Sequence, residues 1–279
     1  MRVTIRELKE MKKGGEKVPM LTAYDYTSAR IVEGAGIPLV LVGDSLGQWL
    51  LGLETTLPVT MDEMLHHVKA VVRGTQTAHI VADMPFMSYQ ADISEALHNA
   101  GRFLKEGGCQ SVKLEGGSAV ADTVRRLVEV GIPVMGHVGF TPQSVNQLGG
   151  YRIQGKFPKA AASLLQDTQA LESAGAYAVV LEMVPAQLSA LVTERLSIPT
   201  IGIGAGVHCD GQVQVFHDLL GLIEDFMPKH ARRYANLGET IRAAVSEYAE
   251  DVKSQRYPSD DESHHMKPEV LEQLAASLP

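Results

Sequence analysis

The sequence is poor in cysteine and has none of the features that are typical of secreted or membrane-spanning proteins. Its 279 residues include two cysteines, Cys109 and Cys209, which are far apart and form no C-x-x-C motif. This excludes a disulfide framework and a zinc site built on thiolates, and it favours a reducing compartment. Charged residues interrupt the apolar positions of residues 1–9, so we expect no signal peptide. No apolar run approaches the ~18 residues of a membrane span, and we expect a cytoplasmic protein.

An excess of basic residues is also lacking. Lysine and arginine number 25 against 33 aspartates and glutamates, which gives a net charge of -8, and no basic block could neutralise a phosphate backbone. Nucleic acid is therefore not an expected partner. The hydrophobic share of 45%, the charged share of 21% and the mean hydropathy of -0.01 are typical of a globular protein with a sizeable core.

Eight short apolar runs alternate with stretches of helical periodicity. Their near-continuous apolarity predicts strands that are buried on both faces, as in a parallel sheet. The predicted strands are residues 20–23, 39–42, 79–82, 111–114, 133–136, 178–181, 200–203 and 213–216. The clearest helix begins after Thr60, where Glu63 completes a capping box. Further helices are expected at residues 93–104, 119–130, 160–174 and 188–196.

This alternation predicts an α/β protein with the (βα)8 TIM barrel fold. A doubly wound open sheet is the alternative, but its glycine-rich phosphate loop should follow the first strand, where Tyr24, Asp25 and Tyr26 stand instead. We expect residues 1–258 to form a single catalytic domain.

Helical extensions are expected at both ends of the barrel. Residues 1–18 predict an extra helix that could cover the bottom of the barrel, and residues 229–255 predict a long amphipathic helix. Residues 259–279 are expected to form a polar C-terminal tail with a short helical segment at 270–274.

Polar residues stand at the carboxyl ends of several predicted strands, where TIM barrels carry their active sites. They are Asp44, Ser45, Asp83, Lys113, Glu115, His137 and Glu182. Four carboxylates in one partly desolvated mouth would repel one another, and a hard cation would resolve the conflict. Asp44, Asp83 and Glu115 come from three neighbouring strands and could coordinate Mg2+, directly or through water. The lack of thiolate ligands argues against zinc.

Single residues at these positions also have simpler interpretations. Each carboxylate alone could cap the helix that follows it, and only their conjunction favours a metal. Lys113 could be a counter-ion for Glu115, or could hold an anionic substrate group, because alternate residues share one face of a strand. His137 could be a core histidine or a substrate contact. Glu182 lies across the barrel from Asp44 and is the candidate general base.

The glycine-rich stretch 201–206 follows the seventh predicted strand. It could bind phosphate through backbone N–H groups, as loops at this position of a barrel often do. It could equally be a tight turn that requires positive φ angles.

Several motifs, together with their spacing over residues 3–258, resemble the ketopantoate hydroxymethyltransferase family. The motifs are residues 21–26, 42–47, 82–87, 112–117, 136–139, 141–144, 201–206 and 209–212. The resemblance implies a barrel of the phosphoenolpyruvate/pyruvate superfamily. It also implies transfer of a hydroxymethyl group from 5,10-methylenetetrahydrofolate, as co-substrate, to 3-methyl-2-oxobutanoate. The product would be 2-dehydropantoate, a precursor of pantothenate.

The resemblance also assigns roles to residues of this sequence. It implies Mg2+ ligation by Asp44, Asp83 and Glu115 and proton removal by Glu182. The implied keto-acid contacts are Asp44, Ser45, Asp83 and Lys113, and we add His137 to these substrate-binding residues. The family implies a homodecamer in which the terminal helices form contacts between subunits. The sequence departs from the family pattern at Gln48-Trp49-Leu50, Phe140 and His230. These departures affect the expected shape of the folate entrance and the expected contacts between subunits in the rings of the decamer.

The predicted chemistry is an aldol-type addition. A 2-oxo acid can chelate Mg2+, the ion stabilises charge on the keto oxygen as an enolate forms, and Glu182 removes the C3 proton. The resulting carbon nucleophile would attack the methylene group of the folate. One alternative is another Mg2+-dependent carbon-carbon lyase of the pyruvate superfamily, which folate-dependent product formation would distinguish. The other is a non-catalytic barrel that binds a keto acid, which an exchange assay would distinguish.

Overall fold

Eight parallel strands close into a barrel in a computed structural model that describes residues 1–223 and 228–278. Each strand pairs with the next one along the chain, and β8 pairs with β1, so the predicted TIM barrel is confirmed. The strands are β1 (Val18–Thr22), β2 (Leu39–Val42), β3 (His79–Asp83), β4 (Ser111–Glu115), β5 (Val134–Gly139), β6 (Ala178–Glu182), β7 (Thr200–Ile203) and β8 (Gly211–Gln214).

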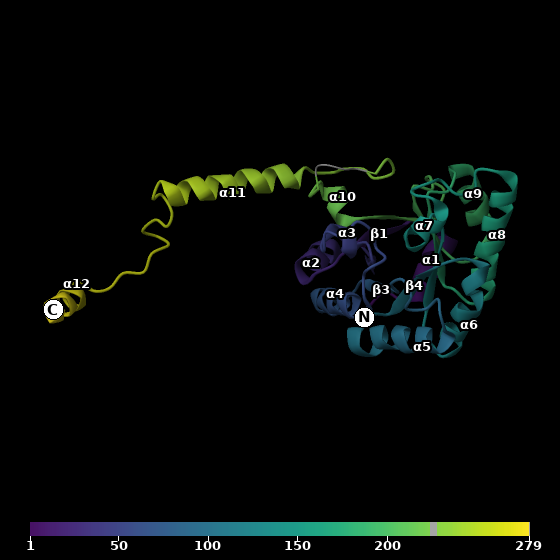
Figure 1. Cartoon of the computed structure of the whole chain (residues 1–279), viewed down its shortest axis with the longest axis horizontal. Coiled ribbons are helices and arrows are strands. Elements are labelled where there is room, and N and C mark those ends of the chain that lie inside the picture. The colour runs from purple at the N-terminus through teal and green to yellow at the C-terminus, as the bar shows by residue number, and fades with distance from the viewer. Residues whose placement is uncertain (224–227, 279) are drawn as a thin grey trace.

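Helices surround the barrel and extend beyond it (Figure 1). The α-helices are α1 (Ile5–Gly14), α2 (Tyr26–Gly34), α3 (Leu46–Trp49), α4 (Met61–Gly74), α5 (Ile93–Arg102), α6 (Ala121–Glu129), α7 (Val145–Leu148), α8 (Pro158–Ser173), α9 (Ala186–Arg195), α10 (Phe216–Leu220), α11 (Leu237–Lys253) and α12 (Pro268–Ser277). A π-helical turn at Phe103–Gly107 and 3-10 turns at Ser118–Val120 and Pro142–Ser144 complete the helical segments. The predicted capping box is present, because Thr60 and Glu63 bond reciprocally at the start of α4.

The core has two parts, one on each side of the strands. The larger part packs the outer faces of the strands against the surrounding helices. The smaller part fills the interior of the barrel with residues such as Met20, Leu39 and Val180, and Leu8 of α1 is buried among them. Because Lys12 of α1 also bonds Asp210 just before β8, at 2.8 Å, α1 closes the bottom of the barrel, as predicted.

The predicted eighth strand, residues 213–216, was placed too far along the chain. The strand β8 begins at Gly211, which pairs with Val18 of β1. A Cβ atom at Gly211 would lie 2.3 Å from the Val18 carbonyl oxygen, so glycine permits the close approach of the two strands. Phe216 belongs to α10, and its N–H donates to Thr22 Oγ1 at 3.0 Å. The apolar residues after the strand therefore belong to the following helix.

The helix predicted at residues 229–255 is shorter than expected, because α11 begins at Leu237. Tyr234 before α11 and Gly238 in its first turn form backbone bonds to the α10 region. The N–H of Tyr234 donates to the Leu219 carbonyl at 2.8 Å, and that of Gly238 donates to Gly221 at 2.9 Å.

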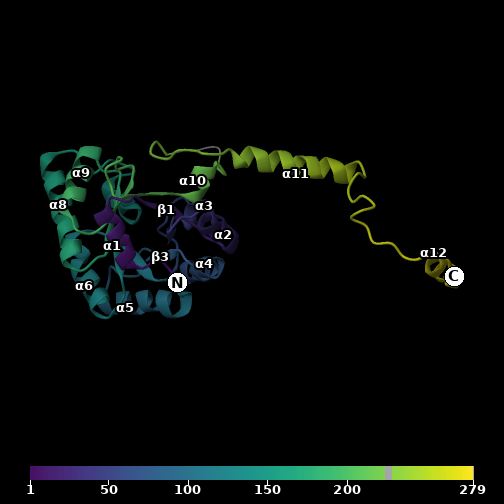
Figure 2. The same cartoon turned by 180° about the vertical axis from the view of Figure 1, so that it is seen from behind.

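Both α11 and α12 project away from the barrel in two opposite views (Figures 1 and 2). Neither helix contains a buried residue. The short tail helix expected at 270–274 is confirmed within α12. Among the described helices, none combines the length and the apolar character that crossing a bilayer requires.

Candidate active site

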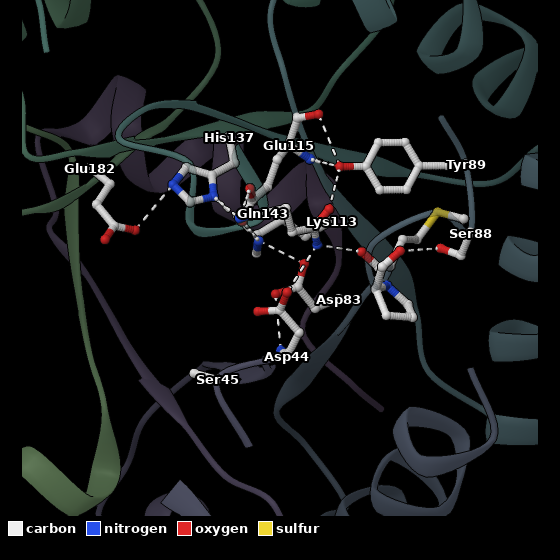
Figure 3. Close-up of polar contacts among 12 residues, drawn as sticks. Asp44, Ser45, Asp83, Ser88, Tyr89, Lys113, Glu115, His137, Gln143 and Glu182 are labelled. Atoms are coloured by element: carbon white, nitrogen blue, oxygen red, sulfur yellow. Dashed lines mark hydrogen bonds and ion pairs between the residues drawn. The ribbon is translucent and has the colours of Figure 1, made fainter. Parts of the chain in front are cut away.

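The carboxyl ends of the strands open into a cavity of about 450 Å³ that every predicted site residue lines. These residues are Asp44, Ser45, Asp83, Lys113, Glu115, His137 and Glu182. Side chains alternate along each strand, so the inward-facing position nearest the carboxyl end lies at the mouth of the barrel. The structure therefore brings together all the residues that the strand-end pattern selected (Figure 3).

Lys113 is the central cation of the site. Its Nζ lies 2.6 Å from Asp83 Oδ1 and 3.9 Å from Glu115 Oε1, and all three side chains are buried. Burial opposes the charged ammonium, but the carboxylates of Asp83, Glu115 and Asp44 raise the pKa of Lys113 above its ordinary value. Lys113 is thus primarily the counter-ion of Asp83, and Glu115 is more distant.

The two aspartates are held close together. The Asp44 N–H donates to Asp83 Oδ2 at 3.2 Å. Burial, followed by the charges of Asp83 and Glu115, raises the pKa of Asp44 well above its ordinary value, although Lys113 opposes the shift. Burial also raises the pKa of Asp83. Both carboxyl groups are therefore harder to ionise than in water, and a nearby cation would favour their charged forms.

His137 connects the buried cluster to the predicted base. Its Nδ1 lies 3.4 Å from Glu115 Oε1, and its Nε2 lies 3.2 Å from Glu182 Oε2. Burial and Lys113 oppose protonation, but contacts with the two glutamates raise the pKa of His137 to about 9. The imidazole is therefore a charged link between Glu115 and Glu182, and Figure 3 shows it between them.

Glu182 stands apart from the lysine and the two aspartates. It ends β6, its side chain is 14% exposed, and His137 is its ion-pair partner. The turn that follows β5 fixes its backbone, because Phe140 N–H donates to the Glu182 carbonyl at 2.8 Å. A carboxylate in this position is partly desolvated and oriented, and it can accept a proton from a molecule in the cavity.

Gln143, which strand-end reasoning did not select, ties the acidic residues together. Its Nε2 donates to Asp44 Oδ2 at 2.9 Å and to the Met84 carbonyl at 2.9 Å, and its backbone N–H donates to Glu115 Oε2 at 3.0 Å. Tyr89 supports this arrangement from the other side. Its hydroxyl accepts the Glu115 N–H at 3.0 Å and lies 2.8 Å from Gln143 Oε1. Tyr89 lies in a loop and Gln143 in the short 3-10 turn Pro142–Ser144, where no periodic pattern indicates which way a side chain points.

Tyr24 positions Ser45. The phenol is fully buried, and its hydroxyl lies 2.8 Å from Ser45 Oγ. Strand-end reasoning did not select Tyr24, because it stands after β1 among residues that predict only a turn and a helix start. The hydrogen bond fixes the Ser45 hydroxyl at the edge of the cavity.

The glycine-rich stretch 201–206 consists of the end of β7 and a tight turn at residues 204–206. Gly204 and Gly206 have φ angles of 66° and 84°, and a Cβ atom at Gly206 would lie 2.4 Å from that of Ala186. The turn packs against the start of α9, and within this stretch only Ile203 lines the cavity. The geometry favours the turn interpretation over phosphate binding.

The acidic side chains of the site have the donor atoms that a divalent cation needs, but their present spacing is not that of a coordination site. Across residues 1–223 and 228–278, no group of three His, Cys, Asp or Glu side chains could hold a metal ion as it stands. The available donors are carboxylate oxygens, which Mg2+ prefers. Burial, together with the charge of Glu115, raises the pKa values of Asp44 and Asp83, and a bound cation would favour their charged forms. The carboxylates of the site therefore fit Mg2+ in their charge and in their donor atoms.

Residues 2–260 match the family model described as ketopantoate hydroxymethyltransferase. The chain is a member of this family. Two relatives named 3-methyl-2-oxobutanoate hydroxymethyltransferase come from Carboxydothermus hydrogenoformans and Chloroflexus aurantiacus. The first is 59% identical over 273 residues, 98% of this chain and 99% of the relative. The second is 56% identical over 278 residues, 100% of this chain and 97% of the relative. As a member of the ketopantoate hydroxymethyltransferase family, the chain is an enzyme of the transferase class.

Two solved structures with a similar fold share much less sequence identity with this chain than these relatives do. A phosphoenolpyruvate phosphomutase from Streptomyces platensis aligns with a TM-score of 0.60 and 16% identity, covering 98% of this chain and 96% of that one. A 2,3-dimethylmalate lyase of the PEP mutase/isocitrate lyase superfamily aligns with a TM-score of 0.60 and 16% identity, covering 99% and 95%. At this identity the likeness concerns the barrel fold alone, which this chain shares with them.

Proposed function

We propose that this enzyme transfers a hydroxymethyl group from 5,10-methylenetetrahydrofolate to 3-methyl-2-oxobutanoate and forms 2-dehydropantoate. The names of the full-length relatives support the acceptor and the transferred group. The observation that carries the mechanism is the arrangement of Glu182 apart from the buried acidic cluster, with His137 between them. A reaction that begins with proton removal beside an anion-binding site needs such a separation.

In this proposal Asp44, Asp83 and Glu115 hold Mg2+, directly or through water. Bound Mg2+ would supply a Lewis acid that stabilises negative charge on the keto oxygen of the substrate. Gln143 would keep two of these carboxylates in place, because it contacts both Asp44 and Glu115.

The remaining residues bind the keto acid and move its proton. Lys113 and Ser45 supply an ammonium and a hydroxyl, both of which can donate to the acid's oxygens. Glu182 takes the proton from C3, while His137 holds the Glu182 carboxylate and stays buried beside it. Water would hydrolyse the methylene bridge of the folate, which breaks its two C–N bonds and frees tetrahydrofolate and a one-carbon unit at the formaldehyde level. The carbon nucleophile would add to that unit, whose oxygen becomes the hydroxyl of the product, so no covalent bond to the protein is required.

An activity assay tests this proposal directly. The purified chain would be mixed with 3-methyl-2-oxobutanoate, 5,10-methylenetetrahydrofolate and Mg2+, and 2-dehydropantoate would be measured with and without a chelator. We expect product only when the folate and the metal ion are both present. Product without the folate, or none under any condition, would contradict the proposed reaction.

We also propose that the chain forms a homo-oligomer, as the decamer of the family implies. The helix α11 projects from the barrel and exposes Ile241, Val245, Tyr248 and Val252, which recur at helical spacing. Such an apolar row is typical of a helix that packs against another surface. Sedimentation of the full chain would measure the oligomeric state, and a monomer would contradict this proposal.

A further inference from the structure

The cavity extends beyond the residues proposed to bind the keto acid. Those residues come from the carboxyl ends of β2, β3 and β4. Another part of the wall is lined by Gln214 at the end of β8, by Val215 directly after it and by Asp218 of α10. Asp218 is the acidic residue of this second part, and the proposed chemistry gives it no role.

Asp218 is buried, and one of its two carboxyl oxygens lacks a hydrogen bond within the described part of the chain. The residue is 6% exposed, and its Oδ1 has no hydrogen-bond partner among the described residues. Burial raises the pKa of Asp218 to about 6, although Arg233 opposes the shift. Arg233 Nη2 donates to the Ile223 carbonyl at 3.0 Å, whereas Arg233 Nε, like Asp218 Oδ1, has no hydrogen-bond partner among the described residues. A buried, unpartnered carboxyl oxygen is unfavourable for folding, which suggests that a ligand completes its hydrogen bonding.

The fold holds Asp218 in a fixed position beside the substrate site. The first residue of α10, Phe216, donates its N–H to Thr22 Oγ1 at 3.0 Å. The ring of His217 lies 5.6 Å from the ring of Tyr24, whose hydroxyl contacts Ser45. Asp218 is therefore anchored through its two preceding residues to the side of the cavity where Ser45 stands.

The chemistry of the two substrates distinguishes which of them Asp218 can bind. The keto acid presents only carboxylate and keto oxygens, which accept hydrogen bonds and would repel a carboxylate. The pterin ring of a reduced folate presents the N3–H and the 2-amino group side by side. Two parallel N–H donors match the two oxygens of a carboxylate, as in other bidentate pairs.

We propose that Asp218 binds the N3–H and 2-amino edge of the pterin ring of the folate co-substrate. This inference rests on the proposed function and assigns the folate a place on the β8 side of the cavity.

The Asp218→Asn variant tests the inference by direct binding. Asparagine keeps the shape of the side chain but places an N–H group opposite one of the pterin donors. Calorimetric titration with tetrahydrofolate should show binding weakened about tenfold or more, the typical effect of losing a charge-assisted bond. The fluorescence of Trp49, the sole tryptophan, gives a second readout because this residue lines the same cavity. Asp122→Asn, at a side chain that is 79% exposed on α6, is the matched control and should leave binding unchanged.

A half-reaction separates this inference from the proposed function. Exchange of the C3 hydrogen of 3-methyl-2-oxobutanoate needs no folate, so Asp218→Asn should retain the exchange rate within about twofold. Normal exchange with unchanged tetrahydrofolate affinity in the variant would overturn this inference alone. Loss of exchange in the variant would also overturn it, because Asp218 would then act on the keto acid. Failure of the unmodified protein to exchange would instead contradict the proposed function.

A ligand variant keeps the test valid even if Asp218→Asn does not fold. A tetrahydrofolate analogue with a methyl group in place of the 2-amino group should bind the unmodified protein about tenfold more weakly than tetrahydrofolate. In the folded Asp218→Asn protein, the difference between the two ligands should largely disappear. Equal affinity of the unmodified protein for both ligands would overturn the inference.

Discussion

Replacing Lys113 with methionine would test the role of the buried ammonium. Methionine has a similar length but no charge, and Lys113 Nζ lies 2.6 Å from Asp83 Oδ1 with 4% and 2% of the two side chains exposed. Removing one partner of a buried ion pair costs about 3–5 kcal/mol, because the other charge stays buried. Since Glu115 is also within 3.9 Å of the ammonium, we expect a loss in this range rather than below it.

The pH dependence of Lys113→Met follows from the neighbouring carboxylates. The pKa values of Asp44 and Asp83 lie above the ordinary value of 3.8, so the folded state binds protons more readily than the unfolded state. The unfavourable contribution of these carboxylates is absent below about pH 3.8 and grows as the pH rises through their folded-state pKa values. Loss of the ammonium raises these values further. The stability deficit of the variant should therefore shrink as the pH is lowered from about 7 to about 5.

Urea unfolding of both proteins at several pH values would measure this deficit. The control is Lys69→Met, because Lys69 lies 3.9 Å from Glu106 and its side chain is 41% exposed, and it should cost no more than about 1 kcal/mol. Added Mg2+ should restore part of the stability of Lys113→Met. A deficit below about 1 kcal/mol, or one that grows on acidification, would refute the account of Lys113 as the counter-ion of the site.

Two further substitutions probe the supports of the site. Gln143→Leu removes the donor to Asp44 Oδ2 and should weaken Mg2+ binding about tenfold in calorimetry. The control Gln76→Leu, at an exposed residue, should bind Mg2+ as the unmodified protein does. Equal Mg2+ affinity of Gln143→Leu and the unmodified protein would show that Gln143 does not position the ligands. Gly139→Ala places a Cβ atom 2.2 Å from the Glu182 carbonyl oxygen at a φ of 96° and should lower kcat more than it changes KM. Gly36→Ala, at a φ of 82° with no atom within 4 Å, should cost only about 1–2 kcal/mol of backbone strain in thermal unfolding and leave kcat intact.

The sequence could predict the barrel and the mouth residues because both depend on local patterns. Lys113 and Glu115 are two residues apart, and strand periodicity alone places them on the same face. The same argument applies to each polar residue at a strand end, all of which line the cavity. The partners of each side chain were not predictable in this way. Lys113 was considered as a counter-ion of Glu115, yet the closer carboxylate belongs to Asp83 on the neighbouring strand.

Residues from loops and short helices escaped prediction for a physical reason. Gln143 contacts Asp44 across 99 positions of the chain, and nothing in its own neighbourhood marks it as a partner of a carboxylate. Asp218 lies in a short helix directly after an apolar run, where a carboxylate is usually solvated. The helix α10 that carries it packs against Thr22 and Tyr24, and the residue is buried there. Long-range contacts of this kind depend on the closed barrel and not on the local sequence.

The central claim is that Glu182 removes the C3 proton of the keto acid beside a metal-holding acidic cluster. It is tested most directly by following the exchange of that hydrogen with deuterated water by NMR, in the unmodified protein and in Glu182→Gln. We predict Mg2+-dependent exchange in the unmodified protein, its loss in the variant, and nearly unchanged keto-acid binding by calorimetry. Exchange at the same rate in Glu182→Gln, or exchange that does not depend on the metal ion, would contradict the account.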